Sequence, residues 1–400
     1  MATMLPNIYN LDEETQFDNY TDKNDIFDVL PSAAQANLDS PGNQIRFNFT
    51  CDRFVLLSSP KTGFRCRVGF RTRTGVNNDM AASITLANNW FGYLFSRGQL
   101  SLCGTPIETV NNLGTAMDIM YHLKGDEFRK SYGEMCGFIP DENSGNSDQI
   151  EFSSTVSAVQ AAVNNAAYSP PVAKNANYNN GYKRRMELYN VIVANNDTVR
   201  YAECFIPLSC LFGFMENFDK VIKFINVDIE LIRENNNNLI SFGANGTTLD
   251  FATAGITGLI NLKLEVETIR PNSEMTVQLN KALKKPLRCN YLQRDCLNKP
   301  PTNNLLVEFS ETKFESPRYI FIVARNGNRN LFRHCDMERI RITVGDEIYP
   351  NLDQSTKFLE NSYTKFYQTY VEASRYFEGQ PSLSMKDFKI SQSIQEFFKQ

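Results

Sequence analysis

The chain has 400 residues, of which 42% are hydrophobic and 12% aromatic, which excludes a wholly disordered protein. This length exceeds what one ordinary core needs and predicts two domains. The formal net charge of −4 argues against a protein that coats nucleic acid by electrostatic attraction.

Alternating apolar and polar residues mark the strands of a large β protein. A period of two places every second side chain on one face, which is typical of a half-buried antiparallel strand. Five segments alternate in this way almost without error: residues 45–50, 66–71, 225–231, 260–266 and 340–344. Their spread along the chain predicts a protein of the sandwich type.

The first forty residues form an acidic segment. Residues 1–40 contain eight acidic residues and one basic residue, Lys23, and they have little periodicity. We predict an extended arm that is mobile or is ordered by a partner. A solvated tail without a role is the alternative.

The first folded unit is predicted over residues 41–271. Its strands are expected at 44–56, 64–72, 83–87, 90–103, 107–110, 183–194, 200–206, 223–233 and 258–268. Residues 207–214 are expected to form a short apolar turn. Large aliphatic side chains are rare over residues 141–182, and a connection this long is usually functional or disordered. We expect this segment to be a long exposed loop.

A boundary near residues 270–286 separates the second unit, residues 272–400. It opens with a predicted helix at 273–284, which Asn272 or Ser273 can cap, and a basic patch of Lys281, Lys284, Lys285 and Arg288 follows. Strands are expected at 305–309, 318–325, 338–344 and 346–350. Apolar residues then fall at helical spacing from 353 to 377.

The sequence offers few residues for catalysis. Only two histidines occur, and His334 neighbours Cys335 on a predicted strand, where adjacent side chains point to opposite faces and cannot act as a dyad. We therefore interpret His122 and His334 as surface or structural residues. The lone acidic pair Asp141 and Glu142 lacks the second carboxylate across a cleft that glycoside hydrolysis needs.

Cysteine spacing does not favour a metal site. The nine cysteines are scattered, no leader for export precedes them, and no apolar run could span a membrane, so we expect reduced, mostly buried thiols in a soluble protein made inside the cell. The pairs Cys204/Cys210 and Cys289/Cys296 are too widely spaced for a metal knuckle. Cys66 is interpreted as core packing. We expect no catalytic, cofactor-binding or metal-binding residues.

Four arginines, Arg65, Arg67, Arg71 and Arg73, lie on one side of a predicted strand. They could contact nucleic acid or another subunit. The alternative is a solvated face paired with acids across the sheet.

The order of several short motifs resembles that of double jelly-roll major capsid proteins. Residues 205–214 (FIPLSCLFGF), the strand 227–233, and the strand 262–270 with its following helix are similar to the first barrel of that family. Residues 316–325, an Asn/Arg loop, and 339–350 ending in Tyr-Pro before a Tyr-rich helix are similar to the second. Together with residues 90–96 and 137–141, they resemble the Polinton (Maverick), adintovirus and virophage branch.

This resemblance implies an all-β fold with short helices, in which two jelly-roll β-barrels stand in tandem. It implies a homotrimeric, pseudo-hexagonal capsomer that tiles an icosahedral shell around a double-stranded DNA genome. The expected partners are other copies, neighbouring capsomers, and penton and minor capsid proteins, without specific nucleic-acid binding, membrane span, cofactor or enzymatic activity. The protein would be made in the host cytoplasm or nucleus and reside in the virion.

Proteins of this type carry further strands after the Tyr-rich helix, whereas this sequence ends at Gln400. We therefore expect a second barrel that either lacks its last strands or is missing a C-terminal segment. In the shell, residues 141–182 would form an outer tower, and the acidic arm would lie beneath the capsomers.

Two other classes of protein fit this sequence less well. A two-domain β-sandwich that binds carbohydrate would need aromatic platforms, yet the chain has one tryptophan, Trp90, and no secretion signal. A cupin-like enzyme would need two or three histidines with a carboxylate around a metal, and neither histidine belongs to a His-x-His pair.

Overall fold

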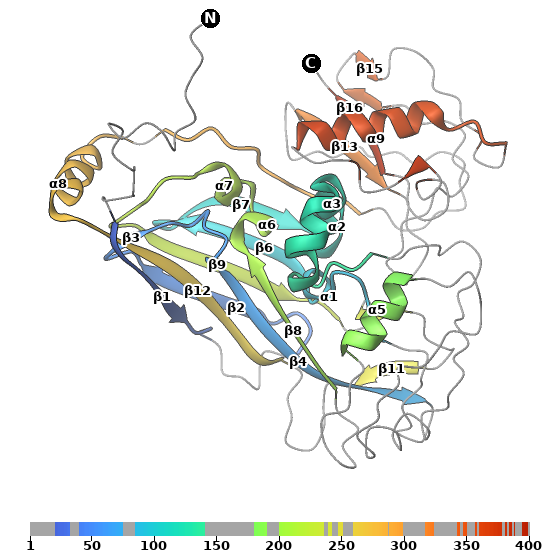
Figure 1. Cartoon of the computed structure of the whole chain (residues 1–400), viewed down its shortest axis with the longest axis horizontal. Coiled ribbons are helices and arrows are strands. Elements are labelled where there is room, and N and C mark those ends of the chain that lie inside the picture. The colour runs from blue at the N-terminus through green and yellow to red at the C-terminus, as the bar shows by residue number, and fades with distance from the viewer. Residues whose placement is uncertain are drawn as a thin grey trace, which may run out of the picture.

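A computed structural model gives the fold of the chain (Figure 1). The residues that it describes are 21–32, 40–74, 85–140, 180–189, 200–235, 239–241, 247–250, 259–286, 288–298, 317–323, 342–344, 347–349, 357, 360–377, 381, 384, 385, 388 and 394–398. Most of the predicted loop 141–182, the strand 305–309 and His334 lie outside these ranges.

Two antiparallel sheets form the first unit. One is ordered β1-β12-β4-β11, with β3 also paired to β12 and β8 to β4. Its strands are β1 (Thr21–Val29), β3 (Phe54–Val55), β4 (Gly63–Thr74), β8 (Arg200–Pro207), β11 (Thr247–Asp250) and β12 (Leu259–Pro271). The other is ordered β2-β9-β6-β7, with β2 (Gln44–Thr50), β9 (Asn226–Arg233), β6 (Phe95–Leu102) and β7 (Thr105–Asn111). A short pair, β5 (Thr85–Leu86) and β10 (Ile240–Ser241), lies apart.

Strand alternation decides which side chains form the core. In β2 and β9 every second residue is buried, as the sequence predicts. Aromatic rings connect the two sheets: Phe47 of β2 meets Phe64 of β4 edge to face with centroids 5.0 Å apart. Phe64 in turn stacks on Phe91, which lies 5.2 Å from Phe95. One continuous apolar core therefore lies between the sheets.

The N-terminal arm prediction is wrong for residues 21–29. These residues form β1, which pairs with β12 from Thr21 opposite Pro271 to Val29 opposite Leu264. Phe27 and Val29 contact the core, and this burial offsets the cost of bringing an acidic strand into the sheet. The remainder of the predicted arm, residues 1–20, lies outside the described part of the chain.

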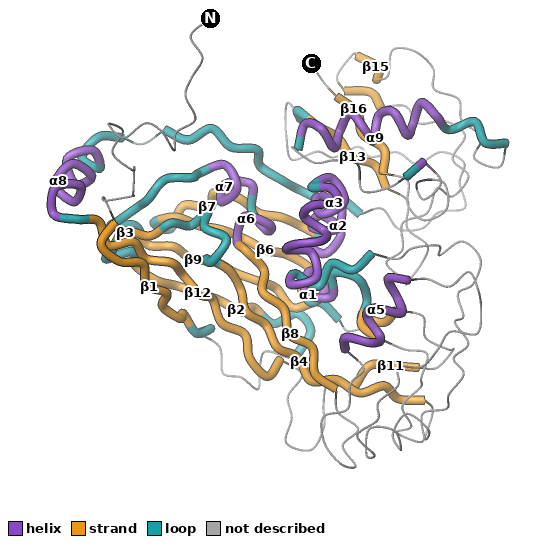
Figure 2. Tube along the Cα trace, in the orientation of Figure 1, coloured by secondary structure: helices purple, strands orange, loops and turns teal. Residues whose placement is uncertain are grey.

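Helices cover one side of the first unit (Figure 2). They are α1 (Trp90–Tyr93), α2 (Leu113–Leu123), α3 (Gly125–Phe128), the π-helix η3 (Arg129–Gly133), α6 (Leu208–Leu211) and α7 (Gly213–Asn217). The strand predicted over 90–103 is thus wrong at its start, where α1 precedes β6. The strand predicted over 183–194 is also wrong, because residues 180–189 form α5 (Asn180–Tyr189).

The helix predicted after β12 is confirmed as α8 (Ser273–Ala282). The side chain of Asn272 caps it by accepting a hydrogen bond of 2.8 Å from the backbone N–H of Met275. It lies at the far end of the first unit from α2 (Figure 1).

A second unit follows, with β13 (Tyr319–Val323) paired to β16 (Ile394–Phe398) and β14 (Ile342–Val344) paired to β15 (Glu347–Tyr349). The predicted Tyr-rich helix is confirmed as α9 (Thr364–Tyr376). Tyr363, Phe366, Tyr370 and Phe388 form its buried cluster. β16 comes after α9 in the chain, so a strand does follow the Tyr-rich helix.

Candidate functional site

The candidate catalytic residues are structural where they are described. His122 is buried on α2, with its Nδ1 2.7 Å from the carbonyl oxygen of Asp118 and its ring edge against Phe138. Within the described ranges, no group of three or more His, Cys, Asp or Glu side chains could hold a metal ion. None of the helices described there is long and apolar enough to cross a bilayer.

The eight described cysteines are free thiols, and five of them are buried. Cys66 of β4 lies opposite Cys204 of β8 in the sheet, inside the core, which agrees with the packing role predicted for Cys66. Burial raises the pKa of Cys204 well above its ordinary value and raises that of Cys51 to about 12. Such thiols stay protonated and are poor nucleophiles.

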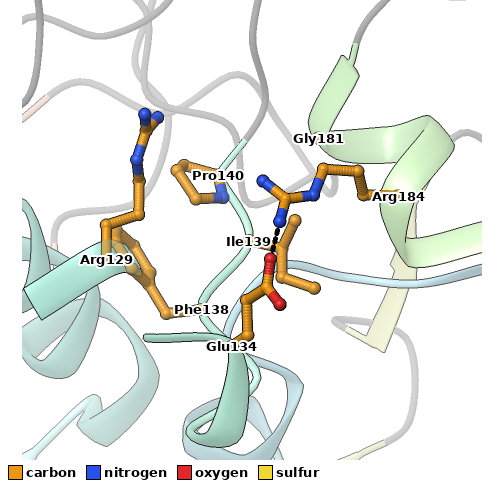
Figure 3. A pocket seen from close by; sticks show the side chains of 7 residues that line it. All are labelled: Arg129, Glu134, Phe138, Ile139, Pro140, Gly181 and Arg184. Atoms are coloured by element: carbon orange, nitrogen blue, oxygen red, sulfur yellow. Dashed lines mark ion pairs between the residues drawn. The ribbon is translucent and has the colours of Figure 1, made fainter. Parts of the chain in front are cut away.

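The pocket drawn in Figure 3 lies between η3, the residues that follow it and α5. Arg184 of α5 points at Glu134 across it and forms an ion pair, while Phe138, Ile139 and Pro140 form one wall. Its volume of about 10 Å³ has room for about one water molecule. The pocket therefore offers no substrate cleft.

Of the four arginines predicted on one side of a strand, Arg65 is paired with acidic side chains on neighbouring strands. This side chain donates to both carboxylate oxygens of Glu265 on β12, at 2.6 and 3.2 Å, and to Glu203 on β8 at 3.1 Å. Hydrogen bonds from Arg65 lower the pKa of Glu265. The guanidinium of Arg67 stacks over the ring of Tyr201 at 4.9 Å. The alternative of a face paired across the sheet is therefore confirmed for Arg65, and the side chains of Arg71 and Arg73 lie outside the described part.

A network of hydrogen bonds and ion pairs lies where the chain leaves the first unit for the second. Residues 288–298, here called the strap, run from the α8 end along the first unit toward α2 and α3 (Figure 2). Hydrogen bonds of 2.8–3.0 Å fasten the strap along its length and join Tyr291 to Ile107, Leu292 to Asn217, Asp295 to Asn111 and Cys296 to Asn112.

Glu108 of β7 lies at the centre of these contacts and is 1% exposed. Its Oε1 accepts from the backbone N–H of Gly213 at 3.1 Å and of Arg294 at 3.0 Å, and its Oε2 accepts from Phe214 at 3.0 Å. One carboxylate thus satisfies two free N–H groups at the start of α7 and one on the strap. Burial raises the pKa of Glu108, although these hydrogen bonds and Arg294 act in the opposite direction.

Gly213 lets the strap approach this closely. A Cβ atom placed on it would lie 1.8 Å from the carbonyl oxygen of Leu292. Any side chain at this position would displace the strap from α7.

An ion-pair chain fixes the far half of the strap. Glu216 of α7 pairs with Arg294 of the strap and, at 2.6 Å, with Lys124 at the end of α2. Burial tends to raise the pKa of Glu216, but the two cations lower it overall. The strap, α7 and α2 are thereby joined.

The second unit also contacts α2 directly. Ile119, Met120 and Leu123 of α2 pack with Ala373 of α9, and Phe321 and Phe377 of the second unit lie against this cluster. Within the described residues, the two units therefore meet at the α2 face, whereas the strap is fastened to the first unit.

Sequence reasoning missed Glu108, Glu216 and Arg294. One signal was available, because Glu108 and Val110 lie at the same parity of the predicted strand 107–110 and hence on its buried face. A carboxylate at an apolar position indicates a buried polar contact. Its partners on the strap could not be known from spacing.

Comparison with known proteins identifies the fold family. The family described as double jelly roll-like domain matches residues 146–396. The chain belongs to this family. Its fold is all-β with short helices, a double jelly roll, and it aligns with a quasi-atomic model of the PBCV-1 virus capsid over 96% of its own length and 79% of that chain, with a TM-score of 0.51 and 10% identity.

Two further solved structures are similar at lower scores. The chain aligns with the Sputnik virophage structure over 68% of its length, with 13% identity and a TM-score of 0.40. It aligns with the mavirus major capsid protein over 69% of its length, with 11% identity and a TM-score of 0.34. In each case it spans about half, 53%, of the other chain. No curated protein matches the sequence.

Proposed function

We propose that this chain is a structural major capsid protein of a virus or a virus-like transposon. The observation that carries the proposal is its double jelly-roll fold, aligned over 96% of the chain with the PBCV-1 capsid.

In this proposal three copies form a pseudo-hexagonal capsomer. Two jelly-roll barrels per chain give six barrels per trimer, and such trimers can tile a hexagonal lattice in an icosahedral shell around double-stranded DNA. The domains would be a first barrel over residues 41–271, to which β1 adds a strand, and a second over 272–400. The protein would reside in the virion and contact neighbouring capsomers and penton and minor capsid proteins.

The finer assignment to the Polinton, adintovirus and virophage branch is supported by residues 205–214 and by the Tyr-Pro strand end before a Tyr-rich helix. The second feature corresponds to β15 followed by α9. We propose this branch on those motifs and their order.

The junction supports a role in a shell. A pseudo-sixfold outline requires a fixed angle between the two barrels, and the α2 face brings the second unit into apolar contact with the first. A chain with one flexible connection would not hold that angle.

The solution mass of the purified full chain, measured by light scattering with negative-stain images, tests the proposal. We expect particles of three times the 45.6 kDa chain mass with a hexagonal outline. A monomer that binds a sugar or a metal would overturn the capsid proposal and favour a binding module or a cupin.

A variant pair sharpens this test. Leu123→Asp places a charge in the fully buried contact between the units and should blur the hexagonal outline. Leu188→Asp, at a side chain that is 52% exposed, is the matched control and should leave the particles unchanged.

A further inference from the structure

The end of the first unit that carries α8 has an unbalanced positive charge. Lys281, Lys284, Lys285 and Arg288 are all exposed within eight consecutive residues. Within the part of the chain that the structure describes, none of them forms an ion pair with an acidic side chain. In a chain with a net charge of −4, this patch is a site for an anionic partner.

The helix beside this patch is poorly covered. α8 has ten residues and none is buried, and its Val277 is 68% exposed. Met275, Leu279 and Leu283 share one face of the helix and are only half-buried. A helix shorter than about 12–15 residues is marginal in water without tertiary packing. α8 therefore lacks part of the cover that its length requires.

An acidic segment of the same chain begins at this place. β1 starts with Thr21 opposite Pro271, one residue before the Asn272 cap of α8. The twenty residues that precede β1 contain Asp12, Glu13, Glu14 and Asp18, and no Lys or Arg. They also contain apolar residues, such as Ile8 and Leu11, that could cover the half-buried face of α8.

We propose that residues 1–20 dock along α8 of their own chain, with the carboxylates of residues 12–18 against the basic patch. The reach is suitable, because Lys281 lies nine residues past the cap, roughly 14 Å along a helix. Three to nine extended residues before Thr21 span roughly 10–30 Å. In this arrangement the four acidic side chains of residues 12–18 would lie opposite the four basic side chains of the patch. This docking concerns the isolated chain and does not depend on a role in a capsid.

The tether favours this occupant over others. Residues 1–20 are covalently held next to α8, so their effective concentration there is about millimolar, which a second copy or a free anion must exceed. A nucleic acid would in addition meet the carboxylates of the same segment, which repel phosphate.

Carbodiimide cross-linking of the full chain tests the proposal, because this reagent joins carboxylates directly to lysine amines that touch them. We expect peptides that link Asp12, Glu13, Glu14 or Asp18 to Lys281, Lys284 or Lys285. In a mixture of ¹⁵N-labelled and unlabelled protein, these links should join equal isotopes. Links absent from these lysines, or found mainly between unlike isotopes, would overturn same-chain docking.

Charge variants make the test specific. The triple change Lys284→Glu, Lys285→Glu and Arg288→Glu leaves the amine of Lys281 for the reagent and should lower the yield of links to Lys281 roughly tenfold, as the loss of three exposed ion pairs would give. Changing Glu13 and Glu14 to Lys in the same protein should restore these links, because opposite charges again face each other while Asp12 and Asp18 keep their carboxylates. Reversing Lys130 and Lys365, two exposed lysines elsewhere, is the matched control and should change nothing.

A nucleic-acid measurement separates the remaining alternative. With a fluorescent 20-nucleotide duplex, the full chain should bind no more tightly than the triple variant. Tight binding by the full chain that the triple variant loses would assign the patch to DNA and overturn the proposal.

Discussion

Substituting Gly213 by alanine is the sharpest probe of the strap. The new Cβ would lie 1.8 Å from the Leu292 carbonyl oxygen, so an ordinary contact of about 3.5 Å requires a displacement of about 1.7 Å. This movement breaks the hydrogen bonds from Leu292 to Asn217 and from Arg294 to Glu108. Losing the exposed bond of Leu292 and leaving the buried Glu108 carboxylate one donor short together cost about 2–4 kcal/mol.

A smaller effect opposes this loss. Alanine is about 1 kcal/mol more favourable than glycine inside a helix, and Gly213 is the first residue of α7. The steric term is larger, so we expect Gly213→Ala to lower the free energy of unfolding by about 1–3 kcal/mol.

Urea unfolding measures the loss, and thiol labelling locates it. Cys289 and Cys296 lie on the strap and are half-buried, so both should react faster with a thiol reagent in the native variant, as read by mass spectrometry. Gly98→Ala is the control, because its Cβ would meet neighbours at 3.5 Å and fits without displacement. If both variants were equally stable and labelled at the parent rate, the strap would not depend on the close approach at Gly213.

Three further outcomes are expected. Leu123→Ala, in the contact between the units, should lower the free energy of unfolding by about 2–4 kcal/mol and separate the calorimetric transition into two. The control Ile348→Ala, at an exposed site, should change the free energy of unfolding by less than about 0.5 kcal/mol. A single unshifted transition for Leu123→Ala would contradict a stabilising contact between the units. The pKa of Glu216 is lowered in the folded chain, so its contribution is present above the unfolded value of about 4.3 and is lost as the pH falls through the folded one. Urea midpoints of Glu216→Gln should therefore fall less than those of the parent on acidification, and an equal fall would count against the ion-pair chain. In the native protein at a pH of about 8, exposed Cys103 should react with a thiol reagent while Cys51, whose pKa burial raises to about 12, reacts only after unfolding; similar rates would contradict the packing.

The alternation of apolar and polar residues made the strands predictable from the sequence. The segment 225–231 became β9, in which every second residue is buried, because one face of that sheet meets the core and the other does not. The capped helix α8 was also predicted, since its Asn272 cap and its termination are local signals. These elements are determined by their own residues and by one packed face.

The elements that sequence reasoning missed are buried on several sides. Ten of the eleven residues of α2 are buried, so no polar face gives it a helical period. All four residues of α1 are buried, and their apolar run continues into β6, so the sequence predicts one strand across both elements. Among the described side chains of α5, Arg185 and Tyr189 are buried. An arginine is normally exposed, so a sequence pattern does not mark its position as part of the core.

The site was less predictable than the fold for a related reason. Glu108 is recognisable as a carboxylate at a core position, but its partners Gly213 and Arg294 lie more than a hundred residues away in the chain. Such a contact is specified by tertiary packing and leaves no local pattern. The paired Arg65 was predicted as one of two alternatives, since its acids come from neighbouring strands and register decides between them.

The contact with the second unit and the ion pairs that hold the strap meet on one helix, α2. Leu123 packs against the second unit, and the next residue, Lys124, pairs with Glu216, which also holds Arg294 of the strap. A substitution on α2 would therefore affect both the contact with the second unit and the ion pairs that hold the strap. In a shell built from repeated contacts, a fixed angle between barrels is what each neighbour must recognise. Under the proposed capsid function, the contact at α2 is therefore where the angle between the two jelly rolls would be set.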